Sequence, residues 1–337
     1  MLIPVAEVTD LAASALRSAG VSENNSEILV RALVEAELRG LPSHGLLRLP
    51  RVVERIRNGV ADPHSTGAHD WATPAHLIVD GQCGIGQVVA THALDAVSDR
   101  ARETGLAMAT ISNSNHIGML SLYAERIAMA GQVLIGLTTS EALVHPWGGR
   151  DAMLGTNPIT IGVPAEPEPF VFDMATGLVS MGKIHDYAHR GEPLPSGWAL
   201  DAAGDPTTDA TAAKDGAIAP FGGPKGYALG LAFEVLVASL TTSATGRDVA
   251  GTLDSDQVCN KGDVFIVAEP VGSMAAVTDY LARIRSSAPA DPDHPVLVPG
   301  DRARTRREQS LREGIDVAED VWQSLRTHAA GADEATW

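Results

Sequence analysis

The hydrophobic pattern of the first part of the chain is helical. Apolar residues recur at helical spacing from Asp10 to Ala19, and the pattern ends at Gly20. Ser22 can cap a second helix that runs to Gly40. A third helix is expected from about Leu49 to Arg57. The polar stretch 63–74, which begins and ends with proline, predicts a boundary after these helices.

From Ala75 onward, short apolar runs alternate with longer amphipathic ones. This pattern predicts strands at 76–80, 106–112, 133–139, 158–163, 169–173 and 263–268. It predicts helices at 84–105, 120–131, 225–241 and 274–285, and two more beyond Pro299. Helix 225–241 is so apolar that we expect it to be buried, whereas 191–223 is rich in loops.

These elements predict an α/β fold with two domains. An α/β domain is expected over residues 71–285, because strands that alternate with helices form a sheet with helices packed against it. A helical domain is expected from residues 1–70, completed by about 286–337.

The charge balance excludes some classes of partner. The net charge of −17 disfavours nucleic acid, and an anionic substrate would need local cations such as Arg48, Lys183 and Lys225. Cys83 and Cys259 are the only cysteines, so a disulfide framework or thiolate metal site is not indicated. No apolar run is long enough to cross a membrane, and the first residues lack the features of a signal peptide, so the cytoplasm is the expected compartment.

The glycines between the strand at 76–80 and the helix that follows do not have the dinucleotide-binding spacing. Gly81, Gly84 and Gly86 lie in GQCGIGQ, which lacks the GxGxxG pattern. A tight turn that lets the helix pack closely is the better interpretation. A dinucleotide would therefore have to bind in another way.

Several polar motifs have the residue types of a catalytic site. Ser43, His44 and Arg48 follow a predicted helix, where the imidazole could transfer a proton and the guanidinium could hold a carboxylate. The motif NSNHIG, with His116, and the motif DMATG follow predicted strands, at whose ends ligands gather in α/β sheets. Taken singly, Ser43 and His44 are better explained as a helix cap and a solvated histidine, and the other two motifs are equally compatible with polar loops.

Two further motifs suggest a phosphate site and a metal site. Lys225 lies in GGPKG, where a glycine-rich turn opens a helix and offers free N–H groups to an anion. His185 and His189, with Asp186 between them, have a spacing compatible with metal ligation on one helical face. Because no third ligand cluster accompanies them, exposed polar residues are the better interpretation.

Taken in order, the motifs resemble the malate/L-lactate dehydrogenase family, which is distinct from the Rossmann lactate and malate dehydrogenases. That family also contains sulfolactate, ureidoglycolate and diketogulonate enzymes and cyclic imino-acid reductases. The stretches that carry the resemblance span nearly the whole chain: SHGLLRLPRVVERIRNG, NSNHIG, PWGGRDAMLGTNPITIGVP, FDMATGLVSMGKI, GWALDAAGDPTTD, GGPKGYALGLAFEVL, CNKGDVFI and VPGDRARTRREQSLREGI.

The resemblance implies a family-specific, non-Rossmann, mixed-sheet domain that binds NAD or NADP, and a homodimer whose active site lies near the subunit interface. It implies that His44 donates the proton, with Ser43 beside it, that Arg48 and Thr156 bind the substrate, and that His116 lies near the nicotinamide as a rival acid/base. It also assigns cofactor contacts to His116, Ser140, Asp173, Met174, Ala175, Lys225, Gly300, Asp301 and Arg302.

One position distinguishes two branches of the family. The resemblance to imino-acid reductases implies an aspartate in a relay with serine and histidine, but Lys183 stands there in this chain. A lysine favours a small 2-oxo or 2-hydroxy acid as substrate, because a cation can polarise a carbonyl or hold a carboxylate. A cyclic imino-acid reductase is the alternative, followed by a metal-dependent lyase or hydrolase and a catalytically silent binder. The choice of acid, of cofactor and of direction stays open.

Overall fold

The structure is a computed structural model in which residues 1–331 are described. Its long helices are α1 (Val5–Ser18), α2 (Glu23–Leu38), α3 (Leu49–Arg57), α4 (Gly86–Thr104), α5 (Ser121–Met129), α6 (Met181–Arg190), α7 (Pro224–Leu240), α8 (Met274–Arg285), α9 (Asp301–Glu313) and α10 (Glu319–Ala329). Short 3-10 turns are η1 (Pro42–His44), η2 (Leu46–Arg48), η3 (Ala212–Asp215) and η4 (Gly246–Asp248).

The strands form one large sheet and two small ones. They are β1 (Leu2–Ile3), β2 (Ala68–Thr73), β3 (His76–Asp80), β4 (Leu106–Ser112), β5 (Val133–Thr138), β6 (Ile159–Val163), β7 (Phe170–Met174), β8 (Ala199–Leu200), β9 (Pro206–Thr207), β10 (Ala217–Ile218), β11 (Asp263–Ala268) and β12 (Ile315–Asp316). The large sheet has seven strands in the order β2-β3-β4-β11-β5-β6-β7. Only β3 and β4 pair in parallel within it, so the sheet is mixed, as expected.

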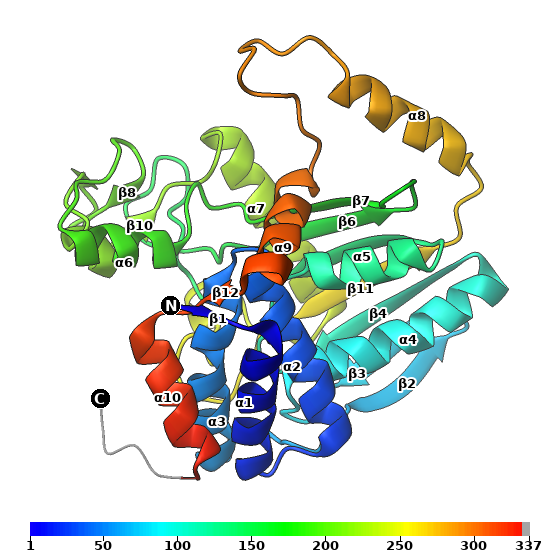
Figure 1. Ribbon diagram of the computed structural model, residues 1–337, viewed down its shortest axis with the longest axis horizontal. Coiled ribbons are helices and arrows are strands. Elements are labelled where there is room, and N and C mark those ends of the chain that lie inside the picture. Colours follow the sequence, from blue (N-terminus) through cyan, green and yellow to red (C-terminus); the bar gives the residue numbers. More distant parts are fainter. Residues whose placement is uncertain (332–337) are drawn as a thin grey trace.

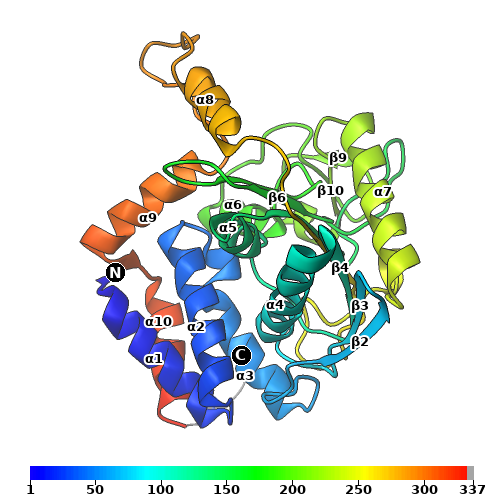
Figure 2. The same ribbon diagram turned by 90° about the vertical axis from the view of Figure 1, so that its right-hand side faces the viewer.

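Helices α4 and α5 cover one face of the large sheet. Their apolar sides pack with Leu77, Ala109, Leu134 and Phe265, which are buried on that face. The strands alternate, so the residues between these point to the other face, where Leu137 and Val264 pack against Val237 of α7. Figure 2 shows α4 and α5 on one side of the sheet and α7 on the other.

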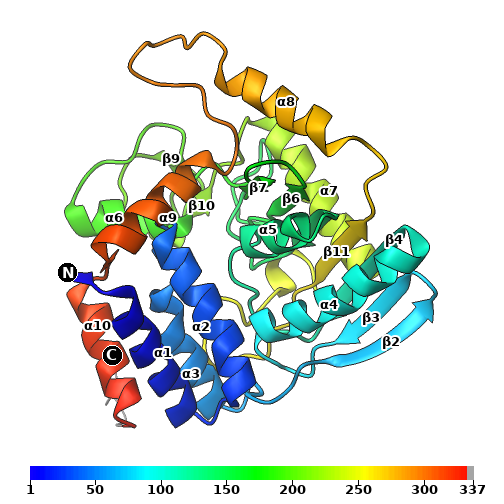
Figure 3. The same ribbon diagram turned by 45° about the vertical axis from the view of Figure 1, so that its right-hand side comes forward.

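A helical bundle lies beside the sheet and is built from both ends of the chain. Helices α1, α2, α3 and α10 share one apolar core, which includes Leu16, Leu33, Val53 and Leu325 (Figure 1). Strand β1 pairs with β12, and α9 crosses one end of α2 (Figure 3). The predicted helical partnership of the two ends is present, while the domain boundaries at 70 and 286 stay a prediction.

The region between β7 and α7 is more ordered than the sequence indicated. Helix α6, η3 and the small sheet β10-β8-β9 enclose a separate apolar cluster that contains Val144, Ile184 and Ile218. The stretch 63–74, expected to be a polar boundary, contains strand β2 at the edge of the large sheet. Its polar residues are tolerated there because both faces of this edge strand are largely exposed.

The expectation that helix 225–241 is buried is wrong for a single copy of the chain. Only Gly226, Gly230, Glu234 and Val237 of α7 are buried, and Val235 and Leu236 have exposed fractions of 58% and 42%. The apolar composition therefore identified an apolar surface, not a core helix. In the part of the chain that is described, no helix is long and apolar enough to cross a membrane.

Candidate active site

Ser43 and His44 lie in η1, directly after the bundle helix α2. The Ser43 hydroxyl and His44 Nδ1 share a hydrogen bond of 3.0 Å. The turn is held from behind by Glu37, whose carboxylate accepts a hydrogen bond of 2.6 Å from the Leu46 N–H. Gly45 is required here, since a Cβ at this position would lie 2.3 Å from Glu37 Oε1. A buried carboxylate thus holds the backbone turn that carries His44.

Arg48 follows in η2, and backbone carbonyls hold its guanidinium. Its Nε donates to the Ser43 carbonyl at 2.8 Å, and its Nη1 donates to the Thr252 carbonyl at 3.2 Å. Burial, then the neighbouring charge of Arg51, lowers the pKa of Arg48 to about 10, so that it stays cationic at neutral pH. A guanidinium has five N–H donors, and the remaining ones are available to an anion.

His116 lies next to His44 but belongs to the sheet and not to the helical bundle. It lies in the loop between β4 and α5, and its Nδ1 accepts a hydrogen bond of 3.1 Å from the Gly118 N–H. The ring centroids of His44 and His116 are 5.6 Å apart. Gly86 allows this loop to approach α4, because a Cβ there would lie 2.4 Å from the His116 carbonyl oxygen. The turn around Gly81–Gly86 is therefore a close-packing turn, as predicted.

Both histidines are neutral at pH 7 in this arrangement. Burial, with a smaller effect from Arg48, lowers the pKa of His44 from 6.5 to about 4. Burial also lowers the pKa of His116 well below its usual value, and the charges of Arg48, His44, Lys261 and Arg51 lower it further. Each ring can accept a proton from a bound acid only if the resulting cation is stabilised by that acid's negative charge.

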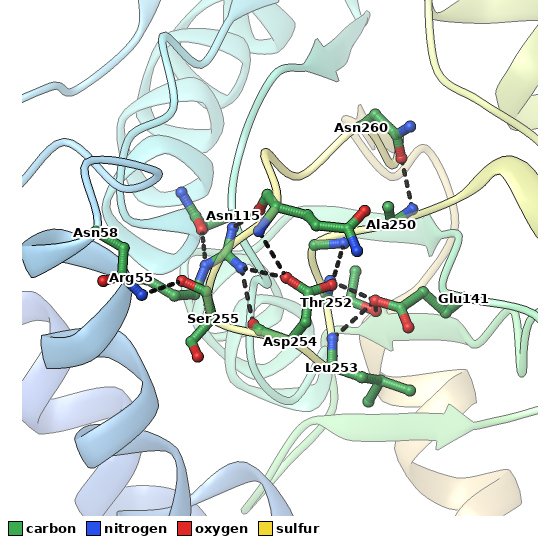
Figure 4. Close-up of polar contacts among 12 residues, drawn as sticks. Arg55, Asn58, Asn115, Glu141, Ala250, Thr252, Leu253, Asp254, Ser255 and Asn260 are labelled. Carbon is green, nitrogen blue, oxygen red and sulfur yellow. Dashed lines mark hydrogen bonds and ion pairs between the residues drawn. The ribbon is translucent and has the colours of Figure 1, made fainter. Parts of the chain in front are cut away.

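The loop 249–260 borders this site through the contact between Thr252 and Arg48, and hydrogen bonds hold it in place (Figure 4). No sequence motif indicated this role. Arg55 of α3 donates to the Asp254 and Gln257 carbonyls at 2.8 and 2.9 Å and to Asn115 Oδ1 at 2.7 Å. Glu141 Oε1 accepts from the N–H groups of Thr252 and Leu253 at 2.7 and 2.8 Å. The loop then presents the Thr252 carbonyl to Arg48, so Glu141 positions Arg48 indirectly.

The residues around His116 enclose a small cavity of about 30 Å³. It is lined by Arg48, Arg51, Val52, Arg55, Ala61, Ile85, Gly86, Gln87, Asn115, His116, Gly251 and Thr252. The cavity combines cationic side chains with the neutral imidazole of His116, which suits a small acid that also accepts a hydrogen bond. Arginines 48, 51 and 55 recur at helical spacing in the sequence. This spacing could have predicted that they line one side of a cavity together.

Ser140 and Thr156, both assigned from the resemblance, are in direct contact. Ser140 Oγ lies 3.2 Å from Thr156 Oγ1 and accepts a hydrogen bond of 3.0 Å from the Thr156 N–H. Ser140 follows β5 and Thr156 precedes β6, so two neighbouring strands bring them together. Glu141 is the next residue along the chain, which connects this hydroxyl pair with the loop that holds Arg48.

Asp173, Met174 and Ala175 lie at the end of β7, next to the start of α5. The Ser121 N–H at that helix N-terminus donates to Asp173 Oδ2 at 2.7 Å. Although the Asp173 side chain remains open to solvent, the protein atoms around it desolvate the carboxyl and raise its pKa, an effect partly offset by hydrogen bonds from Ser121 and Leu120. Thr176 then donates to the Thr156 carbonyl at 2.9 Å, so this segment adjoins the hydroxyl pair.

The remaining cofactor assignments fall into two groups. Lys225 is exposed in the first turn of α7, where Gly223 as N-cap has a φ of +64° that favours glycine. Asp301, by contrast, is occupied by ion pairs: its carboxylate contacts Arg285 at 2.8 Å and Arg304 at 3.1 Å. These contacts lower its pKa and fix the start of α9. Gly300 and Arg302 flank it, the latter exposed.

Lys183 lies near the site without touching its histidine. It is in the first turn of α6, and a Cβ built on the preceding Gly182 would lie 3.9 Å from Ser43 Cβ. Its ammonium group packs over the ring of Trp198, 5.2 Å from the centroid. Within residues 1–331 it makes no hydrogen bond to Ser43 or His44, so its catalytic role stays a prediction.

The histidines considered for a metal site do not converge with further ligands. His185 and His189 are exposed on α6, and Asp186 forms an ion pair of 3.1 Å with Arg190. No group of three or more histidine, cysteine or acidic side chains that could hold a metal ion occurs among the described residues. The metal-dependent hypothesis therefore has no ligand set in this part of the chain.

Comparison with known proteins gives a consistent result along the whole chain. The sequence profile of the family described as malate/L-lactate dehydrogenase matches residues 3–326. The malate/(S)-sulfolactate dehydrogenase of Methanothermus fervidus is 34% identical, and the alignment covers 100% of both chains. The (2R)-3-sulfolactate dehydrogenase (NADP(+)) of Chromohalobacter salexigens is 34% identical over 97% of this chain and 98% of its own. The Delta(1)-pyrroline-2-carboxylate reductase of Ancylobacter novellus is 33% identical over 96% of each.

Solved structures agree with this assignment. A dehydrogenase from Sinorhizobium meliloti superposes with a TM-score of 0.95 at 47% identity, covering 98% of both chains. Sulfolactate dehydrogenase from Methanocaldococcus jannaschii superposes with a TM-score of 0.92 at 32% identity, covering 98% of this chain and 97% of that one.

Proposed function

The chain belongs to the malate/L-lactate dehydrogenase family and is an NAD(P)-dependent oxidoreductase of small 2-hydroxy and 2-oxo acids, and we propose that His44 exchanges the proton in its reaction. One observation carries this proposal: a half-buried, neutral imidazole with a serine hydroxyl on its Nδ1 lies beside an arginine that still has free donors. An acid that binds this arginine through its carboxylate would place its C2 oxygen near the imidazole.

The residues assigned to a nicotinamide cofactor have the donor chemistry that such a molecule needs. Ser140 and Thr156 offer hydroxyl groups, Asp173 retains an oxygen beyond its bond to Ser121, and Lys225 is a cation at a helix N-terminus. Hydroxyls and a carboxylate suit ribose and carboxamide groups, and a cation at a helix N-terminus suits phosphate. A nicotinamide held by these residues would supply the hydride donor or acceptor for C2 of the acid.

The protein side of the reaction is orientation and proton transfer. Arg48 holds the carboxylate, and its own fixed geometry limits rotation of the acid about the C1–C2 bond. In the oxidation direction, neutral His44 accepts the proton of the C2 hydroxyl; in reduction, protonated His44 returns it to the oxygen. The Ser43 hydroxyl orients the ring from Nδ1, which leaves Nε2 for the substrate.

His116 is the alternative proton carrier. Its Nδ1 accepts the Gly118 N–H, so the proton of the neutral ring is on Nε2, and that atom can donate a hydrogen bond. We assign His116 the role of a hydrogen-bond donor to the substrate or nicotinamide, because its Nδ1 is already occupied by the backbone. An imino-acid substrate remains the alternative reaction, and Lys183 in place of an acidic residue argues against it.

The lowered pKa of His44 predicts the pH dependence. For oxidation, kcat/KM should be constant above about pH 5 and fall as the pH drops through about 4, because protonated His44 cannot accept a proton. For reduction, kcat/KM should decrease as the pH rises above about 4, because the protonated form becomes scarce. Initial rates in both directions measure this. An oxidation profile that bends near the ordinary histidine pKa would contradict the burial of His44.

We also propose that the protein is a homodimer that uses the exposed face of α7. This face, the α7 surface, consists of Leu229, Leu231, Val235 and Leu236, and the same side of the sheet exposes Ile78 and Ile135. An apolar area of this kind on a protein of high negative charge is typical of a protein–protein interface. A second copy offers the same apolar area, as a two-fold interface requires.

Replacing Val235 by glutamate is expected to produce monomers. A carboxylate at a position with 58% exposure costs little in one chain, but it would be buried without a partner in the interface. Light scattering after gel filtration measures the mass against the 35.2-kDa chain. Met129→Glu is the matched control, since Met129 is 72% exposed at the end of α5. A Val235→Glu protein that stays dimeric would exclude the α7 surface.

Both cysteines of the sequence are free thiols, which is consistent with the proposed cytoplasmic compartment.

The identity of the acid, the choice of NAD or NADP and the direction are assigned by one assay. The purified protein is given oxaloacetate, 3-sulfopyruvate, pyruvate and a cyclic imino acid, each with NADH and with NADPH. We expect oxidation of the cofactor with at least one 2-oxo acid and little or none with the imino acid. The opposite preference would favour the reductase alternative.

A further inference from the structure

Arg51 is a cation in the candidate site for which no role has been assigned. It lies in the first turn of α3, three residues after Arg48, and both side chains line the cavity beside His116. Residues three apart on a helix lie on the same side, with Cβ atoms ~5–6 Å apart. Burial is the main cause of the lowered pKa of Arg48 and of His116, and the charge of Arg51 adds to the effect at both.

The other charged groups around the cavity have partners. Arg55 is paired with Asp254 and Lys261 with Asp263, the latter fully buried at 2.5 Å. Glu141 Oε1 accepts hydrogen bonds from the backbone N–H groups of Thr252 and Leu253.

Arg51 is different. It is half-buried, and within residues 1–331 it has no hydrogen bond or ion pair with any side chain or backbone group. A guanidinium that is partly removed from water without a partner is unfavourable unless an anion compensates it. Acidic residues outnumber basic ones in this chain, so a shortage of acidic side chains does not explain why Arg51 has no partner in the described residues.

We propose that Arg51 binds a second acidic group of the substrate, so that the site selects 2-oxo and 2-hydroxy acids bearing a carboxylate or sulfonate on C3. This rests on the proposed function, in which Arg48 binds the C1 carboxylate. Two guanidinium groups on one side of a helix match two acidic groups on neighbouring carbons of a short acid. Acids with one carboxylate leave Arg51 without a partner.

The test compares dianionic and monoanionic substrates in variants of Arg51. In Arg51→Gln, kcat/KM for oxaloacetate and 3-sulfopyruvate should fall by ~10- to 100-fold, the loss of a charge-assisted hydrogen bond. The value for pyruvate should change less than about twofold, because pyruvate does not use this residue. Arg51→Lys should recover part of the loss. Arg31→Gln removes the same charge from an exposed position on α2 and should affect neither substrate.

A binding measurement separates this proposal from the proposed function. Calorimetric titration with succinate and with propionate needs no turnover: the unchanged protein should bind succinate more tightly, and Arg51→Gln should lose that preference. Equal losses of kcat/KM for both substrate types, or an unchanged succinate preference, would overturn the role of Arg51. A protein that binds succinate through Arg51 but turns over no 2-oxo acid would overturn the proposed function alone.

Discussion

Replacing His44 by alanine is expected to lower kcat by ~10²- to 10⁴-fold in both directions, the usual contribution of a positioned acid/base. The imidazole is half-buried, is held by Ser43 at 3.0 Å and lies next to Arg48, and alanine leaves no proton carrier at that position. The KM of the cofactor should be nearly unchanged, since most residues assigned to the cofactor lie elsewhere: after β5, at the end of β7, and at the starts of α7 and α9. Steady-state kinetics with saturating cofactor measures both quantities.

His116→Ala is the comparison that assigns the proton. If His44 carries it, His116→Ala should lose less activity than His44→Ala and should retain the pH profile of the unchanged enzyme. His116→Gln preserves a donor and should recover part of that loss. If instead His116→Ala abolishes the reaction and His44→Ala does not, the roles of the two rings are exchanged.

Replacing Arg48 by lysine is expected to raise the KM of the acid by ~10- to 100-fold, with a smaller effect on kcat, because each lost hydrogen bond to a charged group costs ~1.5–3 kcal/mol. Lysine keeps the charge but cannot hold two carbonyls and a carboxylate at once. The Ser43 and Thr252 carbonyls would lose their donors as well. Kinetics with the preferred acid measures the change.

The control for Arg48 is the stability of the variant and its affinity for the cofactor. Arg48 joins η2 to the 249–260 loop, so a modest decrease in the thermal midpoint is expected from its substitution. Fluorescence titration should show an unchanged affinity for the reduced cofactor. An Arg48→Lys enzyme with an unaltered KM for the acid would exclude carboxylate binding at this residue.

The fold could be predicted from the sequence where local signals are strong. Ser22 caps α2 by accepting a hydrogen bond from the Asn25 N–H, and Gly105 ends α4 in the left-handed conformation at a φ of +81°. Apolar runs predicted every strand of the large sheet except the polar edge strand β2. Strand pairing was not visible, because β11 inserts between β4 and β5 from far along the chain. The α7 surface was misjudged, because apolar composition does not distinguish a core from an interface.

The site was predictable only as a set of separate motifs. His44 and His116 were each compatible with a polar loop, and their 5.6 Å separation depends on packing between the bundle and the sheet. Glu37 and Glu141 act through backbone N–H groups, which have no sequence signature. The family resemblance identified Arg48. It gave no role to Arg51, whose lack of a partner among residues 1–331 depends on the tertiary pairing of Arg55 and Lys261 with other groups.

The central claim is hydride transfer to C2 of a small 2-oxo acid, and isotope transfer tests it most directly. The enzyme is incubated with oxaloacetate or 3-sulfopyruvate and with NADH or NADPH that carries deuterium on both positions of nicotinamide C4, and the product is examined by mass spectrometry and NMR. We predict one deuterium, bound to C2 of the 2-hydroxy acid, with none on its oxygen after exchange. Conversion of the acid without deuterium at C2, or no conversion of any acid with either cofactor, would contradict the account.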